Sequence, residues 1–259
     1  MKLKRINVHS LLVCLEIAYG ALALLALTIG PIFTLWRNAQ LNNAALPIEA
    51  AHLSTFVIVQ LPAVYLLGRR TNASLSWKSA ESLLAALVGW ILITSVMSDF
   101  GAYAVGNAIK VALGVTTGLY LATSFTRHQQ VIIIALATHV GVLVSRFAIA
   151  RNWPESIYEL REWSGIYVNP NLLGPVAAVA AISLLFSIVP VYKQIPRQWR
   201  FAVGVVVADV AIFDLIVLFH TKAFTSILST CVVAAIGSMA YLMNRVIPHD
   251  ARKQWWRNS

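Results

Sequence analysis

The chain is dominated by long apolar stretches that follow one another from one end to the other, each separated from the next by a short polar segment. A helix rises about 1.5 Å per residue, so about 20 apolar residues cross the roughly 30 Å hydrocarbon core of a bilayer. The stretch at 83–97 is short, and we expect its helix to begin near Ala80. We predict eight membrane-crossing helices, at residues 11–35, 50–68, 83–97, 104–125, 131–150, 172–191, 201–219 and 223–243.

The composition agrees with a membrane location. Of the 259 residues, 59% are hydrophobic and 12% are charged, which leaves too few polar side chains to cover a water-soluble core of this size. The stretches also lack the ten-residue alternation that is typical of membrane β-barrel strands. We therefore predict an all-α, polytopic integral membrane bundle in which residues 1–259 form a single transmembrane domain.

The basic residues are distributed unevenly between the two sets of alternating loops. One set, which includes both termini, carries 14 Lys and Arg residues, and the other set carries 4. Because short basic loops stay on the cytoplasmic side, both termini are predicted to be cytoplasmic. This orientation makes 151–171 an outward loop and 244–259 a basic cytoplasmic tail.

Several classes of protein are excluded by these patterns. The net charge is +10, but the basic residues stand singly or in small groups and form no continuous face for nucleic acid. Cys14 and Cys231 both lie in apolar stretches, and the histidines lack metal-ligand spacing. We expect no nucleic-acid partner, no metal site and no cofactor.

Charged side chains recur at one depth near the outer ends of the stretches. Lys110, Arg146 and Asp214 lie there, where a charge needs a partner, water or a shallow position. The outward loops add Asp99, Arg161, His220 and Lys222 at the same level. Such a mostly cationic cluster suits a phosphate or diphosphate group. The alternative is that Lys110 and Arg146 extend to the interface while Asp214 pairs with one of them.

Two further polar residues have less defined roles. His220 stands beside Lys222 at the tight turn between the last two stretches, where its imidazole can accept a proton. The alternative for His220 is a solvated loop residue. Asp209 lies deeper in the stretch 201–219 and needs a partner that the sequence does not reveal.

The outward loop before residue 172 has an unusual composition, with aromatic residues and two asparagines at the mouth of a predicted helix. Asn169 precedes a proline and is expected to be extended, whereas Asn171 is placed to cap the next helix. A role in capping the helix explains one of the two asparagines. It does not explain the second asparagine or the aromatic residues beside it.

The segment Trp163-Ser164-Gly165-Ile166-Tyr167-Val168-Asn169-Pro170-Asn171-Leu172-Leu173-Gly174 resembles a known signature. It is similar to the W-x-G-x-[FY]-x-N-[PK]-N-x-[LA]-[GA] pattern of the O-antigen ligase and polymerase superfamily. Members of that family are all-helical proteins of the bacterial cytoplasmic membrane. They move a glycan from a polyprenyl diphosphate carrier to a lipid or glycan acceptor on its outer side, without a metal.

The resemblance implies roles for particular residues. Thr221-Lys222 stands where the family has a Ser-Arg pair that engages the diphosphate, and Arg161 is the nearest match to an arginine before the signature glycine. We expect His220 to act as the catalytic base. The expected substrate-binding residues are Lys110, Arg146, Arg161, Asn169, Asn171 and Lys222.

Two other functions compete with an active glycosyltransferase. Family members continue through further spans and a large outward loop bearing a histidine, whereas this sequence ends after its eighth stretch. That difference favours a non-catalytic, shortened member that modulates a full-length ligase or polymerase, or other polysaccharide-assembly proteins. A small-solute transporter is the last alternative, for which paired mid-span Gly or Pro residues are expected, and Pro62 is isolated.

Overall fold

The helices of the computed structural model follow the apolar stretches. The structure describes residues 8–28, 48–71, 79–153, 156–157, 161–167, 169–192 and 195–246. In these residues there are eight α-helices and a short 3₁₀ helix, η2, at Gly165–Tyr167. The α-helices are α1 (Val8–Leu27), α3 (Ile48–Thr71), α4 (Ser79–Val96), α5 (Ala102–Ser124), α6 (Arg127–Ala150), α7 (Pro170–Tyr192), α8 (Arg197–His220) and α9 (Phe224–Val246). Within the described ranges the all-α class is confirmed.

Most of the predicted boundaries agree with the helices to within a few residues. Helix α4 begins at Ser79, so the backward extension expected for the third stretch is confirmed. Helix α1 ends at Leu27, and residues 29–35 of the first stretch lie outside the described part. Helix α9 continues to Val246. Residues 247–259, which make up most of the tail predicted at 244–259, lie outside the described residues.

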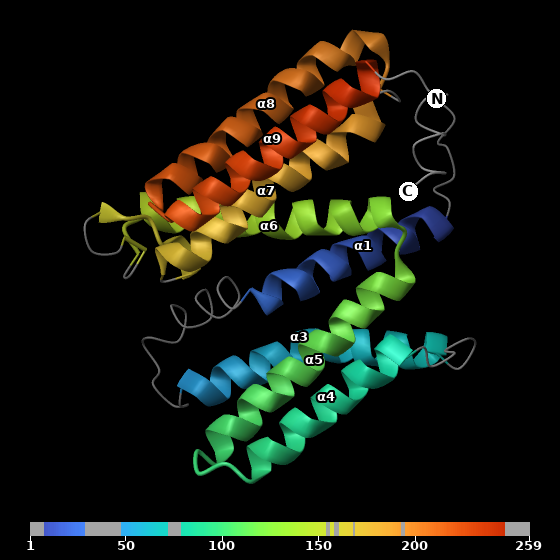
Figure 1. The fold of residues 1–259 in the computed structure, drawn as a ribbon, viewed down its shortest axis with the longest axis vertical. Helices are drawn as coiled ribbons and strands as arrows, with labels where there is room; N and C mark the ends of the chain where they lie inside the picture. Colours follow the sequence, from blue (N-terminus) through green and yellow to red (C-terminus); the bar gives the residue numbers. More distant parts are fainter. Residues whose placement is uncertain are drawn as a thin grey trace.

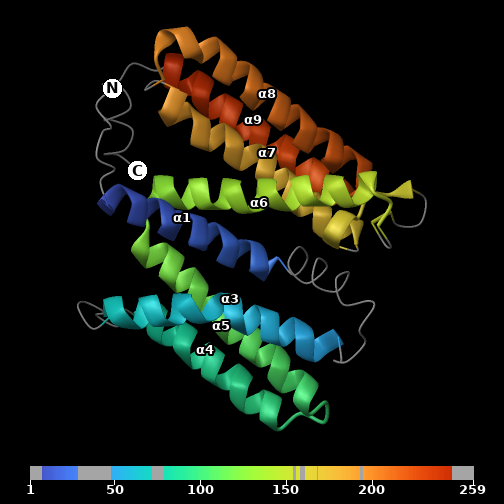
Figure 2. The ribbon, with the colours of Figure 1, turned by 180° about the vertical axis from the view of Figure 1, so that it is seen from behind.

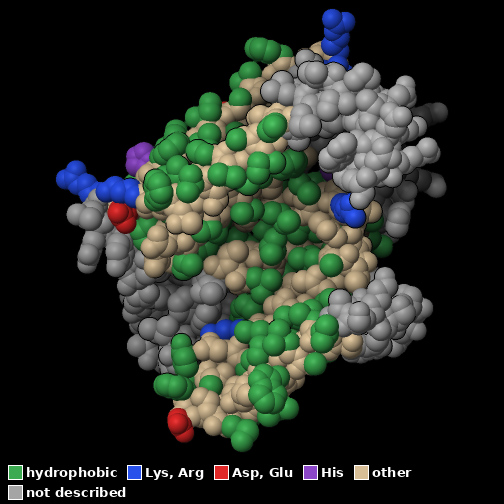
Figure 3. All heavy atoms as spheres, viewed as in Figure 1, with side chains coloured by type: hydrophobic (Ala, Val, Ile, Leu, Met, Phe, Trp, Pro, Cys, Tyr) green, Lys and Arg blue, Asp and Glu red, His purple; other side chains and the backbone are tan. Residues whose placement is uncertain are grey.

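Within the described residues, three helices are long and apolar enough to cross a membrane by length and composition, namely α5, α6 and α8. The apolar parts of the other five are shorter, at Leu11–Leu27, Phe56–Arg69, Ser82–Val96, Pro170–Leu184 and Phe224–Met239. Many large hydrophobic side chains on the outer faces of these helices are exposed, and they cover much of the surface in Figure 3. Apolar surface of this extent indicates a membrane protein.

The helices form two groups that meet along α1. Helices α3, α4 and α5 pack together in one group, and α6, α7, α8 and α9 pack together in the other (Figures 1 and 2). Helix α1 contacts α3 and α5 on one side and α6 on the other. The described part of 151–171 and the α8–α9 turn belong to the second group.

Small residues allow the helices of the second group to approach closely. Ala177, Ala178, Ala180 and Ala181 are all buried on α7, which contacts α6, α8 and α9. In a bilayer, close packing of small side chains replaces the hydrophobic effect as the main source of helix association. This packing places the ends of α6 and α8 beside the start of α7.

A buried polar network joins α1, α3 and α5. The side-chain amide of Gln60 on α3 donates to the carbonyl oxygen of Ala23 on α1 at 2.9 Å. The hydroxyl of Thr117 on α5 donates to Gln60 Oε1. Both polar side chains are fully buried, so each needs the other to satisfy its hydrogen-bonding capacity.

Candidate functional site

The loop that carries the signature segment, here called the motif loop, packs against α6 at Gly165, where there is no room for a side chain. Gly165 has a φ of 58° and contacts Ser145 so closely that an added Cβ would collide with the serine. The Ile166 amide donates to Ser145 Oγ at 3.4 Å. The amides of Ser164 and Gly165 both donate to the carbonyl oxygen of Ser156. The loop is therefore packed into the end of the second helix group.

Tyr167 anchors the other end of this turn. Its hydroxyl lies against Gly141 on α6 and 3.4 Å from Thr28 Oγ1 at the end of α1. Burial raises the pKa of the Tyr167 hydroxyl to about 12, although the Thr28 contact opposes the shift. The tyrosine thus joins the signature segment to α6 and to the end of α1.

The α8–α9 turn lies directly against the motif loop. The Trp163 amide donates to the carbonyl oxygen of His220 at 3.0 Å. The two rings stack, with centroids 4.0 Å apart and an interplanar angle of 23°. Arg146 Cζ of α6 lies 5.2 Å from the centroid of the same Trp163 ring. Three of the residues singled out in the sequence therefore meet in one cluster.

Further cationic side chains stand at the same end. Arg161 and Lys222 are exposed and have positive φ angles of 59° and 53°. Lys222 Nζ lies 4.0 Å from Glu162 Oε1, which offsets part of the positive charge. Figure 3 shows basic, acidic and histidine side chains gathered at the left end of the upper helices. We call Arg146, Arg161, Trp163, His220 and Lys222 the motif-end cluster.

In the neutral His220 ring, the hydrogen-bond contacts show which nitrogen carries the hydrogen and which can accept one. Its Nδ1 lies 2.8 Å from the carbonyl oxygen of Ile216, and a carbonyl oxygen can only accept a hydrogen bond. Nδ1 therefore carries the hydrogen in the neutral ring, and Nε2 is left with a lone pair. The side chain is exposed, so Nε2 is sterically able to take a proton from a ligand.

The two asparagines have different places from those predicted. Asn169 Oδ1 accepts a hydrogen bond from the Asn171 amide at 2.8 Å, and α7 begins at Pro170. Asn169 is thus the cap of α7, and the expectation that Asn171 is the cap is wrong. Proline at the first helical position shifts the helix start by two residues, because its ring pre-sets the helical φ. The exposed side chain of Asn171 lies in the first turn.

Lys110 is not in the motif-end cluster. It is half-buried on α5 and donates to Asn107 Oδ1 of the same helix at 3.4 Å. Helix α5 packs against α1, α3 and α4, whereas the cluster is built from α6, the motif loop and the α8–α9 turn. Equal depth in the sequence pattern did not imply proximity, because depth fixes the position along the membrane normal and not the position around the bundle.

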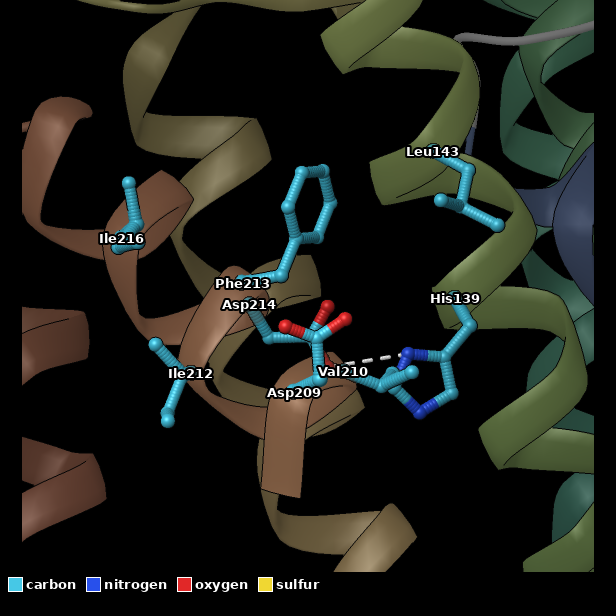
Figure 4. A pocket seen from close by; sticks show the side chains of 8 residues that line it. All are labelled: His139, Leu143, Asp209, Val210, Ile212, Phe213, Asp214 and Ile216. Carbon is cyan, nitrogen blue, oxygen red and sulfur yellow. Dashed lines mark ion pairs between the residues drawn. The ribbon is translucent and has the colours of Figure 1, made fainter. Parts of the chain in front are cut away.

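Sequence reasoning missed a buried pair on α6 and α8. His139 Nδ1 lies 3.0 Å from Asp214 Oδ2, and their side chains are 15% and 1% exposed. The expectation that Asp214 pairs with Lys110 or Arg146 is therefore wrong. His139 was considered only as a metal ligand, and a search for polar residues on neighbouring spans would have paired it with Asp214. Figure 4 shows the imidazole turned toward the carboxylate.

The pair lines a cavity of about 290 Å³ between α6 and α8. Asp209, the deeper carboxylate without an assigned partner, also lines it and is exposed. The remaining walls are apolar, formed by Leu143, Val210, Ile212, Phe213 and Ile216 (Figure 4). Within the described ranges no three His, Cys, Asp or Glu side chains are grouped in a way that could hold a metal ion.

No protein family, curated protein or solved structure matches this chain in comparisons of sequence and structure. The arguments about function therefore depend on the residues and their geometry.

Proposed function

We propose that this protein is an O-antigen ligase-like membrane protein that binds a polyprenyl diphosphate-linked glycan at the motif-end cluster. The observation that carries the proposal is the contact of Arg146, Trp163 and His220, which unites α6, the signature loop and the α8–α9 turn. Lys222 and Arg161 add two exposed cations beside this contact. A diphosphate is the kind of ligand that several convergent Arg and Lys side chains favour.

The proposed reaction is glycosyl transfer to an acceptor hydroxyl of a lipid or a glycan. His220 Nε2 takes the proton of that hydroxyl as its oxygen attacks the anomeric carbon, and the bond to the carrier diphosphate breaks. The cations stabilise the negative charge that develops on the leaving diphosphate. Asn169 contributes by capping α7 beside the site, and Asn171 lies in the first turn of that helix.

The proposed setting is the bacterial cytoplasmic membrane, with eight crossing helices, cytoplasmic termini and the motif-end cluster on the outer side. The bias of Lys and Arg toward one set of loops supports this orientation. In a Cys14→Ser, Cys231→Ser background, Asp99→Cys should react with a membrane-impermeant maleimide added to intact cells, and His128→Cys should react only after lysis. Both positions are exposed, so the reverse labelling would contradict the orientation.

The transfer reaction is tested with purified full-length protein in proteoliposomes, a polyprenyl diphosphate-linked oligosaccharide and an acceptor lipid. We expect Lys222→Gly and Arg146→Ala each to lower the transfer rate by about 100-fold, which is typical of losing one group that stabilises transition-state charge. Glycine at 222 removes the side chain without backbone strain, because the φ there is positive.

Arg127→Ala is the matched control for the transfer assay. Arg127 is an exposed cation at the opposite end of α6 from Arg146, so its loss changes the net charge equally and leaves the cluster intact. An equal rate in wild type, Lys222→Gly and Arg146→Ala would overturn the proposal. An equal loss in Arg127→Ala would also overturn it, because the effect would then come from net charge alone.

A further inference from the structure

The α6–α8 cavity contains two buried polar groups whose hydrogen-bonding capacity is unfilled. Among the described residues, His139 Nε2 and both carboxylate oxygens of Asp214 are buried without a hydrogen-bond partner. Asp214 Oδ2 has only the ion-pair contact with His139 Nδ1 at 3.0 Å. An ionised carboxylate in such apolar surroundings is costly unless a positive charge neutralises it. A positive charge beside Asp214 would therefore be stabilised, and His139 Nε2 is an atom that could bind the proton that supplies it.

The geometry decides which atom receives the proton. The ring nitrogen that faces a carboxylate carries a hydrogen, so Nδ1 is protonated in the neutral imidazole. Nε2 then has the free lone pair. A proton from water that binds Nε2 converts a neutral imidazole and a carboxylate, with a net charge of −1, into an imidazolium and a carboxylate, with a net charge of zero. No other reactant is needed.

The cavity has room for water beside this pair. Its volume of about 290 Å³ is room for several water molecules, each of which occupies about 30 Å³ in the liquid. Asp209 lines the same cavity and is exposed, so it places a polar group on the cavity wall. Asp214 lies six residues before the end of α8, or about 9 Å along the helix from the α8–α9 turn.

The charged groups around the pair are few. On α6, Arg146 is two turns further along the helix and is directed at Trp163. Of the elements packed against α6, the motif loop places the Tyr167 hydroxyl against Gly141, and α1 carries Cys14, Glu16 and Tyr19. On α8, Asp209 is the other titratable residue that lines the cavity. Helix α7 has no acidic, basic or histidine residue in its described sequence, and the titratable side chain described on α9 is the exposed Cys231. His139 is thus the positive charge nearest to Asp214 among the described residues.

We propose that His139 and Asp214 form a proton-binding site within the α6–α8 interface, with Asp209 on the wall of the same cavity. A single proton binds to His139 Nε2, and Asp214 stabilises the imidazolium that results. The site is separate from the motif-end cluster and does not depend on the function proposed for that cluster. Its occupancy changes the charge at the interface of two helices that are long and apolar enough to cross the membrane.

The test is nitrogen-15 NMR of full-length protein labelled at histidine and reconstituted in lipid nanodiscs. His139→Gln assigns the His139 signals by their loss, and the exposed His128 is the internal reference for a solvated ring. In the wild type we expect Nδ1 of His139 to keep its hydrogen at every pH and Nε2 to gain one as the pH is lowered. A ring that stays singly protonated throughout, or one with Nδ1 unprotonated at high pH, would overturn the proposal without any variant.

Two carboxylate variants distinguish the effect of the His139–Asp214 contact from the effect of any negative charge in the cavity. At the pH where half of wild-type His139 is doubly protonated, we expect Asp214→Asn to lower that fraction below about one-tenth, because its counter-charge is gone. Asp209→Asn removes an equal charge from the same cavity, and should change the fraction less than Asp214→Asn does, because Asp214 is the carboxylate in contact with His139. Equal titration in wild type and Asp214→Asn, or an equal loss in Asp209→Asn, would overturn the assignment.

Discussion

The indole of Trp163 and the imidazole of His220 stack with their centroids 4.0 Å apart, and the Trp163 amide donates to the His220 carbonyl oxygen. One side chain comes from the signature loop and the other from the end of α8. The contact therefore fixes the loop to the α8–α9 turn through both backbone and side chain. This arrangement places the only base of the proposed mechanism next to the cations that would hold the diphosphate.

Replacing the stacked indole should loosen the loop. We expect Trp163→Ala to lower the free energy of unfolding by about 2 kcal/mol, less than for a fully buried tryptophan because this ring is half-buried. Trp163→Phe keeps an aromatic face for His220 and should recover most of that loss. Thermal unfolding in nanodiscs measures both variants. Equal stability of the alanine variant and the wild type would show that the stack does not hold the loop.

A side chain at residue 165 should be poorly tolerated. Gly165→Ala combines a φ of 58° with a collision against Ser145, and we expect a loss of about 2–4 kcal/mol from strain and overpacking together. Adding Ser145→Gly removes the clash with the serine side chain but leaves the Cα of residue 145 at 2.9 Å and the φ penalty, so the double variant should recover only part of the loss. Gly118→Ala is the control, since an added Cβ there meets nothing within 4 Å. Its unfolding midpoint should not fall.

The network between α1, α3 and α5 should be strongly non-additive. Thr117→Val leaves the buried Gln60 Oε1 without its donor, which we expect to cost about 1–2 kcal/mol. Gln60→Leu combined with Thr117→Val replaces both partners by apolar groups and should cost less than the sum of the two single changes. A double-mutant cycle by denaturant unfolding measures the coupling. Strictly additive effects would contradict a direct interaction.

Alkaline stability should report on Tyr167. Its pKa is about 12 in the folded protein and 10.0 ordinarily, so the folded state binds the phenolic proton more tightly than the unfolded state. The contribution to stability is full below about pH 10 and is lost progressively as the pH rises toward about 12, by roughly 2–3 kcal/mol in total. Tyr167→Phe removes this proton and should destabilise less steeply over that range. Parallel pH profiles of the two proteins would contradict the buried position of the hydroxyl.

The helices were predictable because each one is a long apolar stretch, and the stretch is the direct cause of the helix in a bilayer. The start of α7 was harder, since Asn169 and Asn171 both suit a cap, and the proline between them decided in favour of Asn169. The sequence places Gly165 in a signature, but only the fold shows that Ser145 occupies the space of its missing side chain.

The grouping of candidate residues at one end of the helices was predictable, and their lateral arrangement was not. Counting residues from the end of a stretch gives depth, which correctly grouped Arg146, His220 and Lys222 at one end. Depth cannot say which helices are neighbours, so Lys110 was grouped with residues that its helix does not contact. For the same reason His139 and Asp214 were treated separately, although the packing of α6 and α8 brings them to 3.0 Å.

The central claim is tested most directly by binding of a polyprenyl diphosphate to the full-length protein in nanodiscs, measured by titration calorimetry. We expect Lys222→Gly and Arg146→Ala each to weaken binding by at least about tenfold, which is the equivalent of one lost charge-assisted contact. Arg127→Ala, at the far end of α6, should bind as the wild type does. Equal affinity in the wild type and both cluster variants would contradict the account.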